Sequence, residues 1–144
     1  MDPRFVRDHE ATSWQVGGSL PKPKLLGIEY ASKAAPIKAT WEHPAATASA
    51  EDRRLFAAPL KSLKTFEFRA KSNPLRAGDP VTDEKWPKDL GRDYGDLPNL
   101  FRFELADQWR GYYSLIGEVG GARIWVLYLW SHEEYSRQSG YSKI

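Results

Sequence analysis

Three closely spaced apolar segments near the C-terminus constrain the fold of this chain more than any other feature. They cover residues 100–105, 109–119 and 122–130 of a 144-residue chain. The first segment alternates apolar and polar side chains, which is the period of a half-buried strand. Gly120-Gly121 separates the other two segments as a hairpin turn does. The sequence therefore predicts a three-stranded antiparallel meander.

The last of these segments differs from the first two. Residues 124–130 read IWVLYLW and show no alternation between apolar and polar side chains. A strand covered on both faces has this composition, whereas an edge strand with one wet face does not. We therefore expect the last strand to be a central strand of the sheet.

The segment before the meander has helical periodicity. Thr47 or Ser49 can serve as N-cap, and acidic residues follow in the first turn. Pro59 is expected to divide this helical region or to begin a second helix at its first position. One face is predicted to be buried, because apolar residues keep helical spacing across the proline: Leu55, Phe56, Leu60, Leu63 and Phe66.

The N-terminal third carries weaker signals. Residues 1–36 contain several Gly and Pro residues and no sustained period, so we expect an arm that is partly disordered or peripheral, with at most a short strand over residues 25–30. Alternation of Ile37, Ala39 and Trp41 with polar residues predicts a first firm strand, ended by Pro44. Residues 73–98 read as a loop with a short structured piece around residues 86–94. Residues 37–144 would form a single domain.

Composition restricts the classes of protein to consider. No apolar stretch approaches the roughly 20 residues that a membrane helix needs, and the first residues do not resemble a secretion signal. The chain has no cysteine, so disulfides and thiolate metal sites are excluded, and we expect a cytoplasmic protein without a membrane partner. The net charge is only +2, but residues 53–76 carry seven basic residues and one acidic residue. That segment could face a phosphate backbone, although a solvated helix face is the more ordinary interpretation.

Seven short motifs follow one another over about three quarters of the chain: Leu63-Lys64, Asn73-Pro74 with Gly78, Pro87-Lys88, NLFRFEL at 99–105, WRGYY at 109–113, HEEY at 132–135, and Gly140-Tyr141. With these motifs in this order, the chain resembles the RelE/ParE superfamily of toxins from type II toxin–antitoxin systems, and among these the archaeal-type RelE-like proteins. The family usually has an acidic residue where this chain has Ser131, and an aromatic residue where it has Ser139.

The resemblance implies a fold and an activity. The expected fold is α+β, with two helices packed on a small antiparallel sheet, one strand before the helices and a three-stranded meander after them. The expected activity is that of an endoribonuclease that cleaves mRNA, acts at the ribosome and arrests translation. Attack by the ribose 2′-hydroxyl needs neither a metal nor a cofactor. The expected partners are a cognate antitoxin, mRNA and the ribosome.

The resemblance also assigns roles to four candidate catalytic residues. Arg110 matches the strand arginine of the family, and its planar fork suits a pentacovalent phosphate; a surface ion pair with Glu104 or Asp107 is the competing interpretation. His132 could be the general acid toward the leaving 5′-oxygen. Tyr135 could stack on a base or share the proton transfer. Glu104 could act as base, although an ion pair with Arg102 or Arg110 is the more ordinary interpretation.

The remaining candidates would bind RNA. Lys85 and Lys88 match the lysine-bearing loop before the sheet and could contact phosphate, although solvated lysines are common. Arg102 projects from the same side of its strand as Glu104 and is placed with the phosphate-binding residues. Tyr141 could bind RNA or pack against the sheet edge.

Two functions of other classes stay open. ParE-like members of the superfamily inhibit DNA gyrase by binding, and the same fold could serve that purpose here. A catalytically degenerate domain of this fold could instead bind RNA or a protein partner. The His132/Tyr135 pair favours the nuclease.

Overall fold

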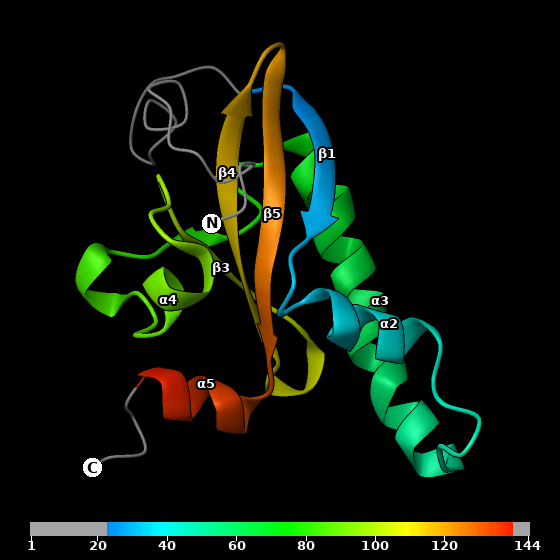
Figure 1. Cartoon of the computed structure of the whole chain (residues 1–144). Helices are drawn as coiled ribbons and strands as arrows, with labels where there is room; N and C mark the ends of the chain where they lie inside the picture. Colours follow the sequence, from blue (N-terminus) through cyan, green and yellow to red (C-terminus); the bar gives the residue numbers. More distant parts are fainter. Residues whose placement is uncertain (1–22, 140–144) are drawn as a thin grey trace.

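The structure is a computed structural model that describes residues 23–139. Its centre is a five-stranded mixed sheet with the strand order β1-β5-β4-β3-β2 (Figure 1). Helices α2 and α3 lie on one side of this sheet, and α4 lies on the other. Helix α5 follows the end of β5. The chain is therefore α+β, as the sequence predicts.

The C-terminal meander is confirmed. It consists of β3 (Phe101–Glu104), β4 (Arg110–Glu118) and β5 (Gly121–Trp130), each antiparallel to the next. Gly120 adopts a φ of 90° in the turn between β4 and β5, a conformation that glycine tolerates without strain. The hairpin signal in the sequence therefore has its expected physical cause.

The first strand lies elsewhere than the alternation of residues 37–41 predicts. That segment belongs to helix α2 (Ala35–Glu42), with a proline in its first turn. Ile37 and Trp41 are also four residues apart, so a helix brings both to the face that packs on the core. Pro36 fits the first turn of a helix, where no backbone N–H is needed. The strand prediction was wrong because a three-residue alternation also satisfies helical spacing.

The strand that precedes the helices is β1 (Leu25–Tyr30). It pairs in parallel with β5, so the sheet is mixed and not purely antiparallel. The expected arm over residues 1–36 is therefore part of the domain from β1 onward, while residues 1–22 lie outside the described residues.

Helix α3 (Ala50–Ser72) is one continuous helix, and the predicted break at Pro59 is wrong. Ser49 caps it, because its Oγ accepts a hydrogen bond from the Asp52 N–H at 3.0 Å. Ser62 Oγ donates to the Pro59 carbonyl at 2.9 Å and accepts from the Ala106 N–H at 3.0 Å. The helix therefore continues through Pro59. The hydrogen bond from Ala106 attaches the turn after β3 to this helix. Its buried face consists of Pro59, Leu63, Phe66 and Ala70.

Strand β5 is buried on both faces, as its sequence predicts. Between the pairs Tyr112–Tyr128 and Tyr113–Val126 the register shifts, so Leu127 is an extra residue on β5. This bulge turns both Leu127 and Tyr128 toward the α4 and α5 side. The faces of β5 therefore differ in composition: aliphatic residues toward α3, and Trp125, Leu127, Tyr128 and Trp130 toward α4 and α5.

A buried amide ties the loop before β3 to the middle of β4. Asn99 Oδ1 accepts from the Leu115 N–H at 2.7 Å, and its Nδ2 donates to the Leu115 carbonyl at 2.9 Å. Ser114 Oγ donates toward Asn99 from 3.0 Å. Because these polar side chains are hydrogen-bonded, the bonds offset the cost of removing the cluster from water.

Short elements complete the chain between α3 and the meander and at its end. Strand β2 (Asp79–Pro80) pairs with β3 at the sheet edge, and a 3₁₀ turn η2 (Asp83–Lys85) and helix α4 (Leu90–Tyr94) follow. The turn η3 (Ala106–Gln108) joins β3 to β4, and α5 (His132–Ser139) follows β5. In the part of the chain that the structure describes, no helix has the length and apolar character needed to cross a membrane.

Candidate functional site

The register of β3 and β4 brings four of the polar residues of these strands to one face of the sheet. Arg102 pairs with Tyr112, and Glu104 pairs with Arg110. Residues directly opposite in an antiparallel pair project from the same face. That face is the one covered by α5, because Tyr112 belongs to the aromatic cluster on the α4 and α5 side.

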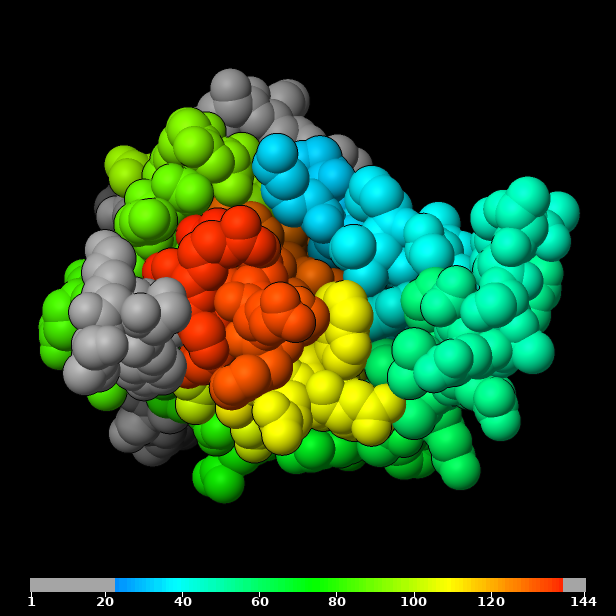
Figure 2. Space-filling view, turned by 90° about the horizontal axis from the view of Figure 1, so that it is seen from below, coloured from blue at the N-terminus to red at the C-terminus, as the bar shows by residue number. Residues whose placement is uncertain are grey.

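Helix α5 places Tyr135 over these residues. Ser131 precedes the helix and caps it, because its Oγ accepts from the Glu134 N–H at 3.3 Å and its carbonyl accepts from the Tyr135 N–H at 2.9 Å. Figure 2 shows α5 at the centre of the lower face of the molecule. Tyr135 points inward from this helix and is only 6% exposed. The local cap and the end of a buried strand therefore fix the position of this side chain.

Two arginines contact Tyr135 in different ways. Arg102 Nη1 donates a hydrogen bond to the Tyr135 hydroxyl at 2.8 Å. The Arg110 guanidinium carbon lies 4.4 Å from the centre of the Tyr135 ring, within the range of a cation–π contact. One phenol therefore holds two permanently charged groups close together, a charge arrangement that suits a phosphate.

Arg110 is further restrained by its own neighbours. Its Nη2 lies 3.6 Å from Glu104 Oε1, and its Nη1 donates to the Gln108 carbonyl at 3.2 Å. The Glu104 side chain is 71% exposed, whereas the Arg110 side chain is 20% exposed. Because an exposed carboxylate is well solvated, this ion pair is weak and can open for a ligand. The structure therefore contains the ion pair between Glu104 and Arg110, which was the alternative to a catalytic role for Glu104.

A cleft of about 570 Å³, the main cleft, opens beside Arg102 and Tyr135. Four basic residues border it, Lys85, Lys88, Arg102 and Arg137, and so do the acidic Asp79 and Glu84. Its formal charge is therefore +2. The main cleft brings together four of the residues that the sequence singled out: Lys85, Lys88, Arg102 and Tyr135.

Other candidates lie apart from the main cleft. His132 is exposed in the first turn of α5 and does not border the cleft. Neither Arg110 nor Glu104 lines it: Arg110 contacts the lining residue Tyr135, and Glu104 contacts Arg110. Tyr141 lies outside the described residues.

The main cleft also contains residues that the sequence did not point to. Tyr112 lines it and is buried, and Trp86 lines it with its indole Nε1 donating to the Val81 carbonyl at 2.9 Å. Tyr112 lies two residues after Arg110 on β4, so both side chains project from the same face of the strand. Tyr112 could therefore have been predicted from the sequence. Trp86 and Arg137 carried no such signal, because their positions depend on how loops and helices pack.

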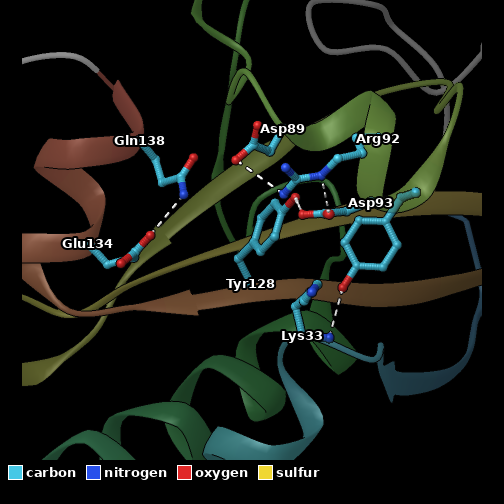
Figure 3. Close-up of polar contacts among 8 residues, drawn as sticks. Lys33, Asp89, Arg92, Asp93, Tyr128, Glu134 and Gln138 are labelled. Carbon is cyan, nitrogen blue, oxygen red and sulfur yellow. Dashed lines mark hydrogen bonds and ion pairs between the residues drawn. The ribbon is translucent and has the colours of Figure 1, made fainter.

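A second polar cluster holds α4 against the sheet (Figure 3). The Tyr128 hydroxyl donates to Asp93 Oδ2 at 2.6 Å, while Arg92 contacts both Asp93 and Asp89. Burial, and then the hydrogen bond to Asp93, raises the pKa of the Tyr128 phenol above its usual range. On α5, Glu134 accepts from Gln138 Nε2 at 2.8 Å. Tyr128, Asp93 and Arg92 are paired with one another, so this part of the cluster is a structural brace between α4 and the sheet.

The site contains no set of metal ligands among residues 23–139, where no three His, Asp or Glu side chains lie close enough together to hold an ion. What it offers is positive charge, a buried phenol and an exposed carboxylate beside a cleft. Such groups can bind an anion and transfer protons. Comparisons with known proteins found no family model, no curated protein and no solved structure that matches this chain.

Proposed function

We propose that this protein is a RelE-like toxin, an endoribonuclease that cleaves mRNA at the ribosome and arrests translation. The observation that carries the proposal is the cluster of Arg102, Tyr135 and Arg110 beside a basic cleft. Two guanidinium groups on one phenol form a site for a phosphate group, and RNA is the phosphate polymer that such a toxin cleaves.

The order of elements supports the proposal. A strand precedes two helices, α2 and α3, and a three-stranded meander follows them. The meander ends in a helix that carries the HEEY motif. This order of elements agrees with the order expected of a RelE-like protein, whereas the parallel pairing of β1 with β5 and the additional helix α4 are not part of that expectation.

The proposed reaction is a transesterification within the RNA. The ribose 2′-oxygen forms a bond to phosphorus, and the bond from phosphorus to the 5′-oxygen of the next nucleotide breaks. One proton leaves the 2′-hydroxyl and one is delivered to the 5′-oxygen, so the products are a 2′,3′-cyclic phosphate and a 5′-hydroxyl. Arg110 and Arg102 would stabilise the additional negative charge on the phosphoryl oxygens.

The proton transfers need two groups. Tyr135 lines the cleft and its hydroxyl is hydrogen-bonded to Arg102, so this hydroxyl is the first candidate for one transfer. Glu104 can accept the 2′-hydroxyl proton when its ion pair with Arg110 opens. A role for His132 as general acid requires the RNA to extend from the cleft over the first turn of α5. Variants of Tyr135 and His132 distinguish these assignments.

A second candidate is a domain of the same fold that binds RNA or a protein without cleaving it. It is favoured by the contacts that both arginines already make within the protein. Arg110 contacts Glu104, the Gln108 carbonyl and the Tyr135 ring. Arg102 is hydrogen-bonded to Tyr135. With His132 outside the cleft, such a site could bind phosphate and do no chemistry. Inhibition of gyrase by binding belongs to the same class.

The test is expression from a tightly repressed promoter in a host without the antitoxin. Incorporation of labelled amino acids and of labelled thymidine is followed after induction. The proposal predicts an early loss of protein synthesis while DNA synthesis continues. Early failure of DNA synthesis would favour gyrase inhibition, and continued growth with folded protein present would favour the domain that only binds.

A further inference from the structure

Two further basic residues, Arg69 and Arg76, lie next to the main cleft. Between α3 and the edge of the sheet is a hollow of about 360 Å³, here called the α3 cleft. Arg69 of α3 and Arg76 of the turn after it border this cleft. Arg102 and Asp79 border both clefts. The two clefts therefore adjoin at the residue that binds Tyr135.

Only a short strand pairs with the sheet edge where the clefts adjoin. Strand β2 has only two residues and pairs with Phe101 and Arg102 of β3. Phe103 and Glu104 continue β3 beyond the end of β2, and both border the α3 cleft. A ligand can therefore pass from one cleft to the other without a longer edge strand in its way.

The charges along this path suit a polymer that carries several phosphates. Arg69 and Arg76 are exposed, and the side chain of neither has a hydrogen bond or ion pair with another described residue. The carboxylates on this path are Asp79, Glu84 and Glu104, and Glu104 already contacts Arg110. The basic residues lining the two clefts are Lys85, Lys88, Arg137, Arg102, Arg69 and Arg76, so the path has a formal charge of +3.

We propose that the α3 cleft is an extension of the RNA site, in which Arg69 and Arg76 bind phosphates of the strand on one side of the group held by Arg102 and Arg110. This inference rests on the proposed function, because it takes RNA as the substrate. The ligand class is single-stranded RNA long enough to reach both clefts. Each guanidinium can hold a phosphate through two N–H donors and is always charged.

The test measures binding of RNA that cannot be cleaved. Two single-stranded RNAs with 2′-O-methyl groups are used, a tetranucleotide that fills one cleft and a dodecanucleotide that spans both. The double variant Arg69→Ala/Arg76→Ala is compared with Lys61→Ala/Lys64→Ala. The control removes the same charge from exposed positions of α3 that do not border the α3 cleft.

The proposal predicts that only the Arg69/Arg76 variant loses affinity for the dodecanucleotide, by roughly tenfold at moderate salt. The slope of log K against log salt should fall by about 1.4 for two lost phosphate contacts. Binding of the tetranucleotide should stay within twofold of the unchanged protein. Equal losses in both double variants, or no loss in either, would overturn the proposal.

Two further outcomes separate this inference from the proposed function. If the wild-type protein cleaves RNA but Arg69 and Arg76 do not affect binding, the α3 cleft is not part of the site and the nuclease assignment stands. If long RNA binds through these arginines and no RNA is cleaved, the extended site stands and the nuclease assignment fails. Tighter binding of a poly-glutamate peptide than of the dodecanucleotide would replace RNA with an acidic protein segment and overturn the proposal.

Discussion

The hydroxyl of Tyr135 on α5 accepts a hydrogen bond from Arg102 on β3 at 2.8 Å, across 33 positions of sequence. The ring of the same tyrosine lies under the guanidinium of Arg110 on β4. The last helix therefore joins two strands of the meander through one side chain. If the protein acts on phosphate, this contact sets the distance between its two anion-binding groups.

Tyr135→Phe separates the hydroxyl from the ring. The variant keeps the cation–π contact with Arg110 and loses the hydrogen bond from the charged Arg102, so its free energy of unfolding should fall by about 1.5 to 2 kcal/mol. If the hydroxyl transfers a proton, cleavage of RNA should fall by roughly 100-fold or more. Urea unfolding and single-turnover cleavage measure the two effects separately. Unchanged cleavage by a folded Tyr135→Phe protein would assign the tyrosine a structural role only.

His132→Ala tests the most exposed candidate. Because the His132 side chain is exposed, the free energy of unfolding should change by less than about 0.5 kcal/mol. A general acid at this position predicts that the variant no longer arrests growth. The neighbouring Glu133→Ala is the matched control, since Glu133 is also exposed in the first turn of α5. Full toxicity of His132→Ala would remove the histidine from the mechanism and leave Tyr135 as the proton donor.

Asn99→Ala is expected to be the most damaging of the polar substitutions. It leaves the N–H and the carbonyl of Leu115 without partners in a buried position, which costs about 3 kcal/mol in the free energy of unfolding. Asn73→Ala is the control, because Asn73 makes one side-chain hydrogen bond, to the Leu75 N–H, at a half-buried helix end. That variant should lose about 1 kcal/mol. Equal losses in both would show that the Asn99 network does not stabilise the meander.

Stability should fall at alkaline pH. Burial raises the pKa of the phenols of Tyr30, Tyr94, Tyr113 and Tyr128 above the usual value. The unfolded chain, in which a tyrosine has a pKa of about 10, therefore loses these protons first as the pH rises. The contribution of these phenols to stability is complete below about pH 9 and is lost progressively above about pH 10. Urea unfolding at a series of pH values measures the slope.

Tyr113→Phe gives the control for this pH dependence. Tyr113 is fully buried and donates to the Pro74 carbonyl at 2.7 Å, so the variant should lose about 1 to 2 kcal/mol at neutral pH. It should also show a shallower alkaline slope, by up to about 1.4 kcal/mol per pH unit. A free energy of unfolding that stays constant to strongly alkaline pH in the unchanged protein would contradict the assignment of these buried phenols.

The sequence predicted the meander because its signals are local. Alternation in β3, the Gly120 turn and the uninterrupted apolar run of β5 depend only on neighbouring residues. The predictions for Pro59 and for the segment of Trp41 were wrong because local signals there fit more than one structure. Residues 37–41 fit both a strand and a helix, and Pro59 could break a helix or lie within one. The outcome depends on packing against residues far along the chain, such as Ala106 beside Ser62.

Four of the residues that line the main cleft were singled out from the sequence, but their geometry was not predicted. Arg110 and Glu104 could be paired once β3 and β4 were taken as a hairpin. The contact of both arginines with Tyr135 requires α5 to fold back over the sheet, and no spacing in the sequence encodes that angle. For the same reason the sequence could not tell that Tyr135 lines the main cleft and that His132 does not.

The proposed cleavage of mRNA is tested most directly by mapping RNA ends in a translation extract programmed with a defined mRNA. We predict that the purified protein produces cuts within the translated message whose downstream fragments carry 5′-hydroxyl ends. Arg110→Ala should reduce this cleavage by roughly 100-fold or more while remaining folded. An intact message in the presence of folded wild-type protein, or cleavage that Arg110→Ala leaves unchanged, would contradict the proposed site.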